Sequence, residues 1–234
     1  MIDRLVINGC SYMNYYHQGG GTQDLASRLG LSECLSLAKN SVCNSRILRT
    51  TLRDMYSAHT PTLYVLGTTF INRYELTLLE QPDFDGTWVS CNGQTINRLS
   101  DAYKTEATLT SINNFARSHV DLMNGKDLLE DLMYRLLCLI DAAKNKSHQV
   151  LIFNTAEHAV DYYLHEPRYD QLRQTVEIVG GFHWRSIPWQ FEQGATYPPE
   201  DEQYPANCRH VAPEQHQWLN EFLTNYIKEH KLLQ

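Results

Sequence analysis

The stretch Leu5-Val6-Ile7-Asn8-Gly9-Cys10-Ser11-Tyr12 stands a few residues from the amino terminus of this 234-residue chain. It is a short apolar run that stops at a glycine, a small residue and a hydroxyl. A buried strand that ends in this way presents a nucleophile at the carboxyl edge of an α/β sheet, which is the edge where open sheets bind their ligands. The stretch therefore predicts a parallel sheet whose first strand leads directly to Ser11.

The rest of the chain alternates short apolar runs with longer segments, some of which carry apolar residues at helical spacing. That alternation is typical of right-handed βαβ units. Asn44 stands where it would cap the helix of the second crossover. The expected strands are Val6 to Ile7, Leu35 to Ala38, Leu63 to Leu66 and Val150 to Phe153, and the expected helices are Gln23 to Leu29, Asn44 to Tyr56, Asp127 to Lys144 and Pro213 to Lys231.

The last two of these helices are each expected to pack an apolar stripe onto the sheet. Two other stretches, Tyr74 to about Ser118 and Gln190 to Asn207, are rich in Pro, Gly and polar residues and are predicted to be irregular insertions. The expected stripes are Leu128, Leu129, Leu132, Leu136, Ile140 and Ala143 in the first helix, and Trp218, Leu219, Phe222, Leu223 and Ile227 in the second.

Length and composition favour one folded domain over residues 1–234. The formal net charge of -7, without a run of Lys or Arg, argues against a nucleic-acid partner. Leu128 to Ala143, the most apolar helical window, is too short and too charged to span a membrane. Because no secretory signal precedes the first strand and the six cysteines form no C-x-x-C pair, we expect reduced thiols and a cytoplasmic location.

Four short blocks, in this order along the chain, together resemble the SGNH (GDSL-like) hydrolases. They are Gly9-Cys10-Ser11-Tyr12, Ala38 to Ile47, Val65-Leu66-Gly67-Thr68-Thr69-Phe70, and Asn207-Cys208-Arg209-His210. The resemblance implies a single-domain three-layer α/β/α sandwich with a flavodoxin-like parallel sheet of about five strands and two irregular insertions. It also implies ester cleavage by a serine and a histidine, with Ser11 as the nucleophile, His210 as the base and no cofactor or metal.

Each block departs from the family pattern at one position. Cys10 takes the acidic position of the first block, and Ser41 stands where glycine is usual in the second. Thr69 takes the place of the asparagine in the third block, and Asn207 that of the aspartate that orients the histidine. An aspartate-to-asparagine change in a serine protease triad lowers turnover about ten-thousandfold. Asn207 would orient His210 through its side-chain oxygen, unless an acid of the segment 200–202 takes that role.

The remaining roles at the site follow from these blocks and from the expected convergence of the turns after the first three strands at one edge of the sheet. The oxyanion-hole candidates are the backbone N–H groups of Ser11 and Ser41 and the side chains of Asn44 and Thr69. The candidate substrate-binding residues are Gly9, Gly67 and Arg73, and His216 matches the usual second histidine of the family. An alternative interpretation, a metal or redox cluster, would use Cys10, Cys43, Cys208 and His210.

Two functions follow from this pattern. The first is a serine-histidine hydrolase of an acyl or acetyl ester, with a small-molecule or carbohydrate ester as substrate. The second is a catalytically inactive SGNH-like domain that serves as a binding or assembly protein of a phage or bacterial complex, with protein partners or copies of itself as ligands. Aromatic residues in and near the irregular segments, including Trp88, Trp184 and Trp189, suit either a carbohydrate groove or a partner surface.

Overall fold

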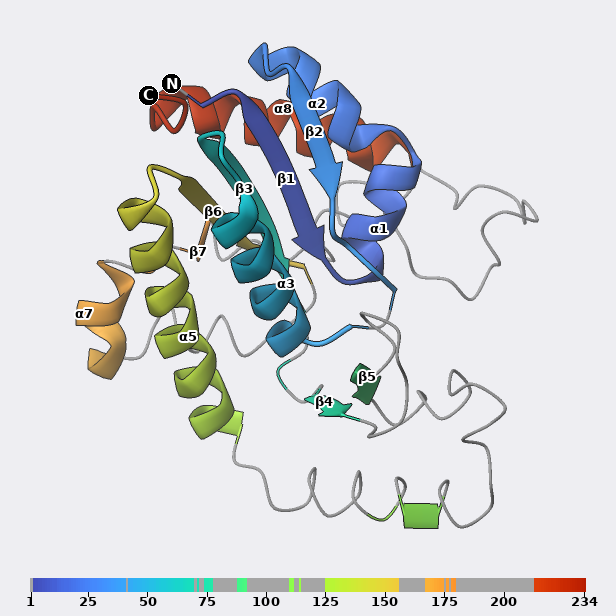
Figure 1. Ribbon diagram of the computed structural model, residues 1–234, viewed down its shortest axis with the longest axis vertical. Coiled ribbons are helices and arrows are strands. Elements are labelled where there is room, and N and C mark those ends of the chain that lie inside the picture. Colours follow the sequence, from blue (N-terminus) through green and yellow to red (C-terminus); the bar gives the residue numbers. More distant parts are fainter. Residues whose placement is uncertain are drawn as a thin grey trace, which may run out of the picture.

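A parallel sheet with helices on both faces forms the centre of the molecule (Figure 1). The computed structural model describes residues 2–40, 42–69, 71, 74–77, 88–91, 110–111, 114, 125–155, 167–174, 176, 178–179 and 213–234.

The main sheet has five strands in the order β2-β1-β3-β6-β7 within the described ranges, and all neighbouring pairs are parallel. This is the flavodoxin-like order, in which the chain winds outward from the first strand in both directions. The predicted α/β fold and three of the four predicted strands are therefore confirmed, whereas β2 begins and ends two residues before the predicted Leu35 to Ala38, and β7 was not predicted. The strands are β1 (Arg4–Gly9), β2 (Glu33–Ser36), β3 (Thr62–Thr68), β6 (Gln149–Asn154) and β7 (Ile178–Val179).

Side chains that alternate along the strands build one apolar cluster on each face of the sheet. Leu5 and Ile7 of β1 join the cluster under α1 (Ser11–Gln18), α2 (Gly21–Leu29) and α8 (Pro213–Glu229). Val6 joins the opposite cluster with residues of α3 (Asn44–Ser57) and α5 (Gly125–Asn145), and with Tyr169, which ends the short helix η3 (Pro167–Tyr169) before α7 (Asp170–Arg173). The expected three layers are present.

The first crossover contains two helices where the sequence predicts one. α2 covers the expected helix, but α1 begins at Ser11, directly after β1. The buried side of α1 consists of Tyr12, Met13 and Tyr16, a stripe that is largely tyrosine and gives a weak apolar signal. Gly20, between the helices, has a φ of 82°. That left-handed conformation suits a residue without a Cβ and lets the chain turn between α1 and α2.

The buried stripes of α5 and α8 differ in part from those predicted. In α5, Leu128 and Ile140 are half-buried, and Met133 and Leu139 are buried in addition to the expected leucines. In α8, Trp218 and Phe222 are half-buried, and their rings stack on each other with centroids 5.4 Å apart. Polar residues occupy part of the buried face on which Trp218 and Phe222 were expected. The buried side of α8 comprises His216, Leu219, Asn220, Leu223, Thr224 and Ile227.

The first predicted irregular insertion contains a pair of short strands. β4 (Tyr74–Thr77) and β5 (Trp88–Cys91) pair antiparallel and form a sheet separate from the main one. The second predicted insertion, Gln190 to Asn207, lies outside the described residues, as do Trp184 and Trp189.

No helix among the described residues is both long enough and apolar enough to cross a membrane.

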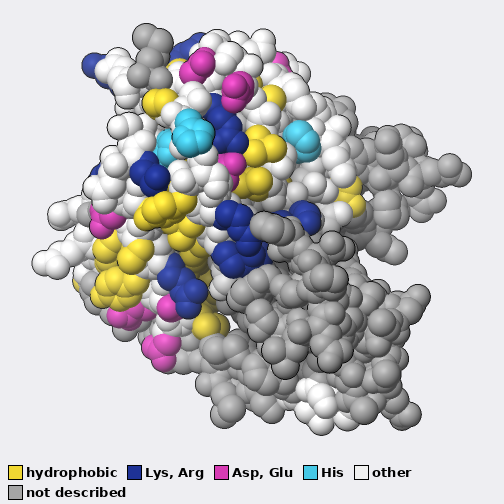
Figure 2. Space-filling view, viewed as in Figure 1, with side chains coloured by type: hydrophobic (Ala, Val, Ile, Leu, Met, Phe, Trp, Pro, Cys, Tyr) yellow, Lys and Arg dark blue, Asp and Glu magenta, His cyan; other side chains and the backbone are white. Residues whose placement is uncertain are grey.

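The outer surface of the α3 and α5 layer mixes basic and hydrophobic side chains (Figure 2). Tyr56, near the end of α3, and Tyr134, on α5, are 65% and 51% exposed. The Lys146 ammonium lies 4.6 Å from the centre of the Tyr56 ring, at a distance that suits a cation–π contact. Single exposed aromatic side chains of this kind are ordinary on a protein surface.

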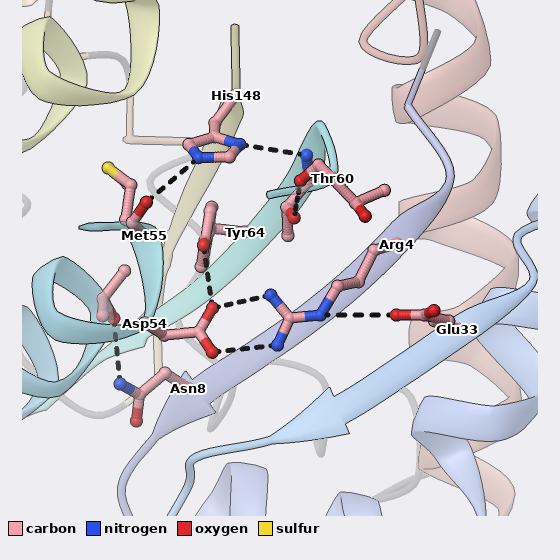
Figure 3. A network of polar contacts seen from close by, with 10 residues as sticks. Arg4, Asn8, Glu33, Asp54, Met55, Thr60, Tyr64 and His148 are labelled. Carbon is pink, nitrogen blue, oxygen red and sulfur yellow. Dashed lines mark hydrogen bonds and ion pairs between the residues drawn. The ribbon is translucent and has the colours of Figure 1, made fainter. Parts of the chain in front are cut away.

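A polar network joins β1, β3 and α3 at the amino edge of the sheet, away from Ser11 (Figure 3). Arg4 donates two hydrogen bonds of 2.8 Å to the two carboxylate oxygens of Asp54, and the Tyr64 hydroxyl donates a third, also 2.8 Å long. Burial alone would raise the pKa of Asp54, but the hydrogen bonds from Arg4 and Tyr64 bring it below its usual value. The bidentate ion pair therefore fixes the end of α3 to the start of β1.

His148, the residue before β6, adds further polar contacts at this edge of the sheet. Its Nδ1 accepts a 3.1 Å hydrogen bond from the Thr62 backbone N–H, and its Nε2 lies 3.3 Å from the Met55 carbonyl oxygen. Because Nδ1 is the acceptor, Nε2 carries the proton and the ring is neutral. Burial lowers the pKa of His148 below its ordinary value.

This buried neutral histidine predicts a loss of stability in mild acid. The unfolded chain binds a proton at His148 near pH 6.5, whereas the folded chain resists it until lower pH, so the free energy of unfolding falls as pH decreases from about 7. The slope contributed by His148 is at most about 1.4 kcal/mol per pH unit. Urea unfolding between pH 7.5 and 5 should show a shallower slope for His148→Gln than for wild type.

The control for this prediction is His59→Gln at an exposed position, which should keep the wild-type slope. Glutamine at position 148 can accept from Thr62 and donate to Met55 without titrating. Equal slopes in wild type and His148→Gln would show that His148 does not cause the pH dependence.

Candidate active site

The candidate nucleophile lies at the point where the sheet reverses its winding direction. β1 and β3 are neighbours, with Gly9 opposite Gly67 in the parallel register. Ser11 follows β1 as the first residue of α1 and is half-exposed. In open α/β sheets, ligands bind outside the carboxyl ends of the strands at such a switch point. The prediction that the turns after the first three strands open on one edge is confirmed for the described parts of those turns.

Two glycines allow α1 to lie close to this edge. A Cβ on Gly9 would collide with the Met13 side chain and lie 3.0 Å from the Gly67 carbonyl oxygen. A Cβ on Gly67 would lie 2.6 Å from Thr155 Cγ2 and 2.8 Å from Met13 Cγ. Met13 therefore fills the space that both glycines leave open. This packing explains why both positions are glycine, and their predicted role in substrate binding stays a prediction.

Cys10 occupies a position where a carboxylate would have an apolar environment. The residue is fully buried within the cluster under α1 and α8. Its Sγ lies 3.6 Å from Thr155 Oγ1, and the Thr155 hydroxyl in turn donates to the Thr68 carbonyl oxygen. An ionised acid here would need a charged partner or several donors, whereas a thiol packs as a small hydrophobic group. The departure at Cys10 is therefore consistent with the packing of this turn.

Asn44 does not cap α3, so that prediction is wrong. The N-cap residue is Cys43, and Asn44 is the first residue of the helix. The carboxamide instead reaches 25 residues along the chain: its Oδ1 accepts a 2.8 Å hydrogen bond from Thr69 N–H, and its Nδ2 donates a 2.9 Å bond to the Thr69 carbonyl oxygen. Thr69 is fully buried. The structure thus brings together two of the predicted oxyanion candidates and joins them to each other.

A second buried carboxamide joins the end of β1 to α3. Asn8 Nδ2 lies 2.9 Å from the Ile47 carbonyl oxygen, 2.8 Å from Thr50 Oγ1 and 2.9 Å from Thr51 Oγ1. Its Oδ1 accepts a 2.9 Å hydrogen bond from the backbone N–H of Gly9. No role was predicted for Asn8, although a polar residue within an apolar strand is a signal of a buried hydrogen-bonded contact.

The other half of the predicted site lies outside the described residues. These positions are Ser41, Arg73, Asn207, His210 and the acidic segment 200–202. Cys208 lies there too, so the alternative of a metal or redox cluster stays a prediction. Among the residues that the structure does describe, no group of three or more His, Cys, Asp or Glu side chains gathers in a way that could hold a metal ion.

The helix that follows His210 packs against the helix that begins with Ser11. His216, in the first turns of α8, is buried, and its ring meets that of Tyr16 edge-on with centroids 5.5 Å apart. A Cβ on Gly19 would lie 2.7 Å from His216 Nδ1. The predicted second histidine therefore lies against α1, the helix of the predicted nucleophile.

Hydrogen bonds reinforce this contact between α1, α2 and α8. The Tyr16 hydroxyl donates to Asn220 Oδ1, and Asn220 Nδ2 donates a 2.6 Å bond to Asp24, which also accepts a 2.8 Å bond from Arg28. Burial, followed by the charge of Asp24, raises the pKa of Tyr16 well above its ordinary value, so the phenol stays neutral. The three helices are thereby fixed relative to one another.

Comparisons with known proteins found likeness to solved structures but none to a family model or a curated protein. A crystal structure of a lipase/acylhydrolase from Enterococcus faecalis is similar over 98% of this chain and 97% of that chain, with 12% sequence identity and a TM-score of 0.38. The strand order, rather than this likeness, defines the fold of the present chain.

Proposed function

We propose that this protein is a serine-histidine hydrolase that cleaves an acyl or acetyl ester of a small molecule or a carbohydrate. Ester cleavage needs a hydroxyl next to a base, and donors directed at the oxygen that becomes negative. Ser11 supplies the hydroxyl, His210 the base, and the backbone N–H groups of Ser11 and Ser41 the donors. Thr69 remains a predicted contributor to the oxyanion hole, and Arg73 a predicted contributor to the substrate site.

One observation carries the proposal: half-exposed Ser11 begins a helix at the switch point of the sheet, and α8 packs against that helix. His216 contacts the far end of α1, about 12 Å from Ser11 along the helix axis. His210 precedes His216 by six residues, of which the last three steps are in α8, so this stretch can span up to about 15 Å. A stretch of this length would allow His210 to reach Ser11.

The proposed reaction has two halves. Ser11 Oγ attacks the ester carbonyl carbon while His210 takes the hydroxyl proton, and Asn207 orients the imidazole. The carbonyl oxygen becomes negative and receives hydrogen bonds from the Ser11 and Ser41 N–H groups. His210 then gives its proton to the leaving alcohol. Water, activated by His210, releases the acyl group from Ser11 and restores the enzyme.

A second candidate function is binding or assembly without turnover. It is favoured by Thr69, which takes the place of a side-chain oxyanion donor but is fully buried, with its backbone held by Asn44. In this candidate the site edge would contact a partner protein or another copy of the chain.

Labelling with a fluorophosphonate probe separates the two candidates. The hydrolase should accept about one label per folded chain, located by mass spectrometry on the peptide that contains Ser11, because only an activated serine reacts with the probe. Protein unfolded in urea is the control and should not be labelled. Folded protein without a label would contradict the hydrolase and support the assembly role.

A further inference from the structure

α3 connects the two strands that border the candidate site. Asn8 attaches the end of β1 to the helix through the Ile47 carbonyl and the hydroxyls of Thr50 and Thr51. Asn44 attaches Thr69, the first residue after β3, to the same helix. Asn8 is fully buried and Asn44 is 8% exposed, so water competes little for either carboxamide.

The Asn44–Thr69 pair has the geometry of a clamp. One carboxamide satisfies both backbone groups of Thr69, the N–H at 2.8 Å and the carbonyl oxygen at 2.9 Å. Two bonds from one planar group fix the orientation of the chain as well as its position. An unpaired buried backbone group is unfavourable, so loss of the carboxamide would be accommodated by movement of the turn after β3.

We propose that Asn44 is a positioning residue that holds the turn after β3 in register with the turn that carries Ser11. This inference rests on the proposed hydrolase function. Gly9 and Gly67 are paired in the register, so the turns that follow them begin side by side. A misplacement of about 1 Å between reacting groups can cost about a hundredfold in rate. Asn44 acts through Thr69 in this scheme and does not itself donate to the oxyanion.

The test compares Asn44→Ala and Asn44→Asp with wild type, using hydrolysis of p-nitrophenyl acetate. Asn44→Ala should lower kcat by roughly ten- to a hundredfold because both bonds to Thr69 are lost. In Asn44→Asp, an ionised carboxylate can accept from Thr69 N–H but faces the Thr69 carbonyl without a proton. The protonated acid supplies one acceptor and one donor, as the amide does.

The ratio of kcat in Asn44→Asp to kcat in wild type is therefore expected to rise as pH falls from 8 to 5. Burial and the adjacent carbonyl favour the protonated acid, whereas the Thr69 N–H and the amino end of α3 favour the ionised one, and the ratio rises with the fraction of the acid that is protonated. If Asn44 donated directly to the oxyanion, kcat of Asn44→Asp would not recover in this way. The protonated acid has only one O–H, and that group donates to the Thr69 carbonyl oxygen. Dividing by the wild-type rate removes the titration of the catalytic base.

Asp54→Asn is the matched control for stability. It breaks a partly buried ion pair at the opposite edge of the sheet, so it should lower the free energy of unfolding and leave kcat of the folded protein within about twofold. If wild type is active, two outcomes would overturn the positioning role alone. The first is a ratio of kcat in Asn44→Asp to kcat in wild type that does not change with pH. The second is a kcat of Asn44→Ala that is no lower than that of Asp54→Asn. Wild type that neither hydrolyses the ester nor reacts with the fluorophosphonate would overturn the proposed function, and the positioning role with it.

Discussion

Replacing Ser11 with alanine is expected to lower kcat/KM for p-nitrophenyl acetate by at least about a thousandfold, because the attacking hydroxyl is removed. The substitution keeps the Cβ at the first position of α1, and alanine is a good helix former. Ser11 is only half-buried, so the free energy of unfolding should change by less than about 1 kcal/mol. The loss of activity would then reflect chemistry and not unfolding.

Ser45→Ala is the control for this variant. Ser45 is also a half-exposed serine in the first turn of a helix at the same edge of the sheet. It should retain wild-type activity, as measured by steady-state kinetics together with thermal unfolding of each protein. A folded Ser11→Ala protein with full activity would show that another group attacks the ester. Wild type without activity would favour the assembly role.

The strands and the site edge could be predicted from the sequence because their signals are local. The apolar run that ends at Gly9 indicates a buried strand, and parallel strands bring their carboxyl ends to one edge. The start of α1 was missed because a stripe containing two tyrosines, Tyr12 and Tyr16, gives little contrast between its faces. The polar half of α8 was missed for a similar reason, because buried Asn220 and His216 look like surface residues in the sequence.

The contacts that organise the site depend on residues far apart in the chain, which a local pattern cannot reveal. A local rule assigns Asn44 to a helix cap, but its partner Thr69 is 25 residues away and takes the carboxamide. Gly9 and Gly67 match motif positions, yet both must be glycine because the Met13 side chain fills the space that a Cβ would need. The role of His148 likewise depends on Thr62 and Met55, from two other elements.

Replacing Asn207 with aspartate is expected to raise kcat for p-nitrophenyl acetate roughly ten- to a thousandfold. An asparagine oxygen can orient His210 but carries no charge to stabilise the imidazolium that forms when Ser11 attacks. Aspartate supplies that charge, and the reverse change in a serine protease is costly. The added carboxylate should also raise the pKa of His210, so the acid limb of the kcat/KM profile should move to higher pH.

The double variant Asn207→Asp/His210→Ala decides whether such a gain comes through His210. If aspartate acts by supporting the imidazole, the double variant should be as inactive as His210→Ala, because the two residues work as one unit. A gain that persists without His210 would contradict this arrangement. If Asn207→Asp folds normally and shows no gain while His210→Ala is inactive, then position 207 does not support the base. The supporting acid would then be sought at Glu200, Asp201 and Glu202 by single substitutions to alanine, of which one should reduce kcat to the level of His210→Ala.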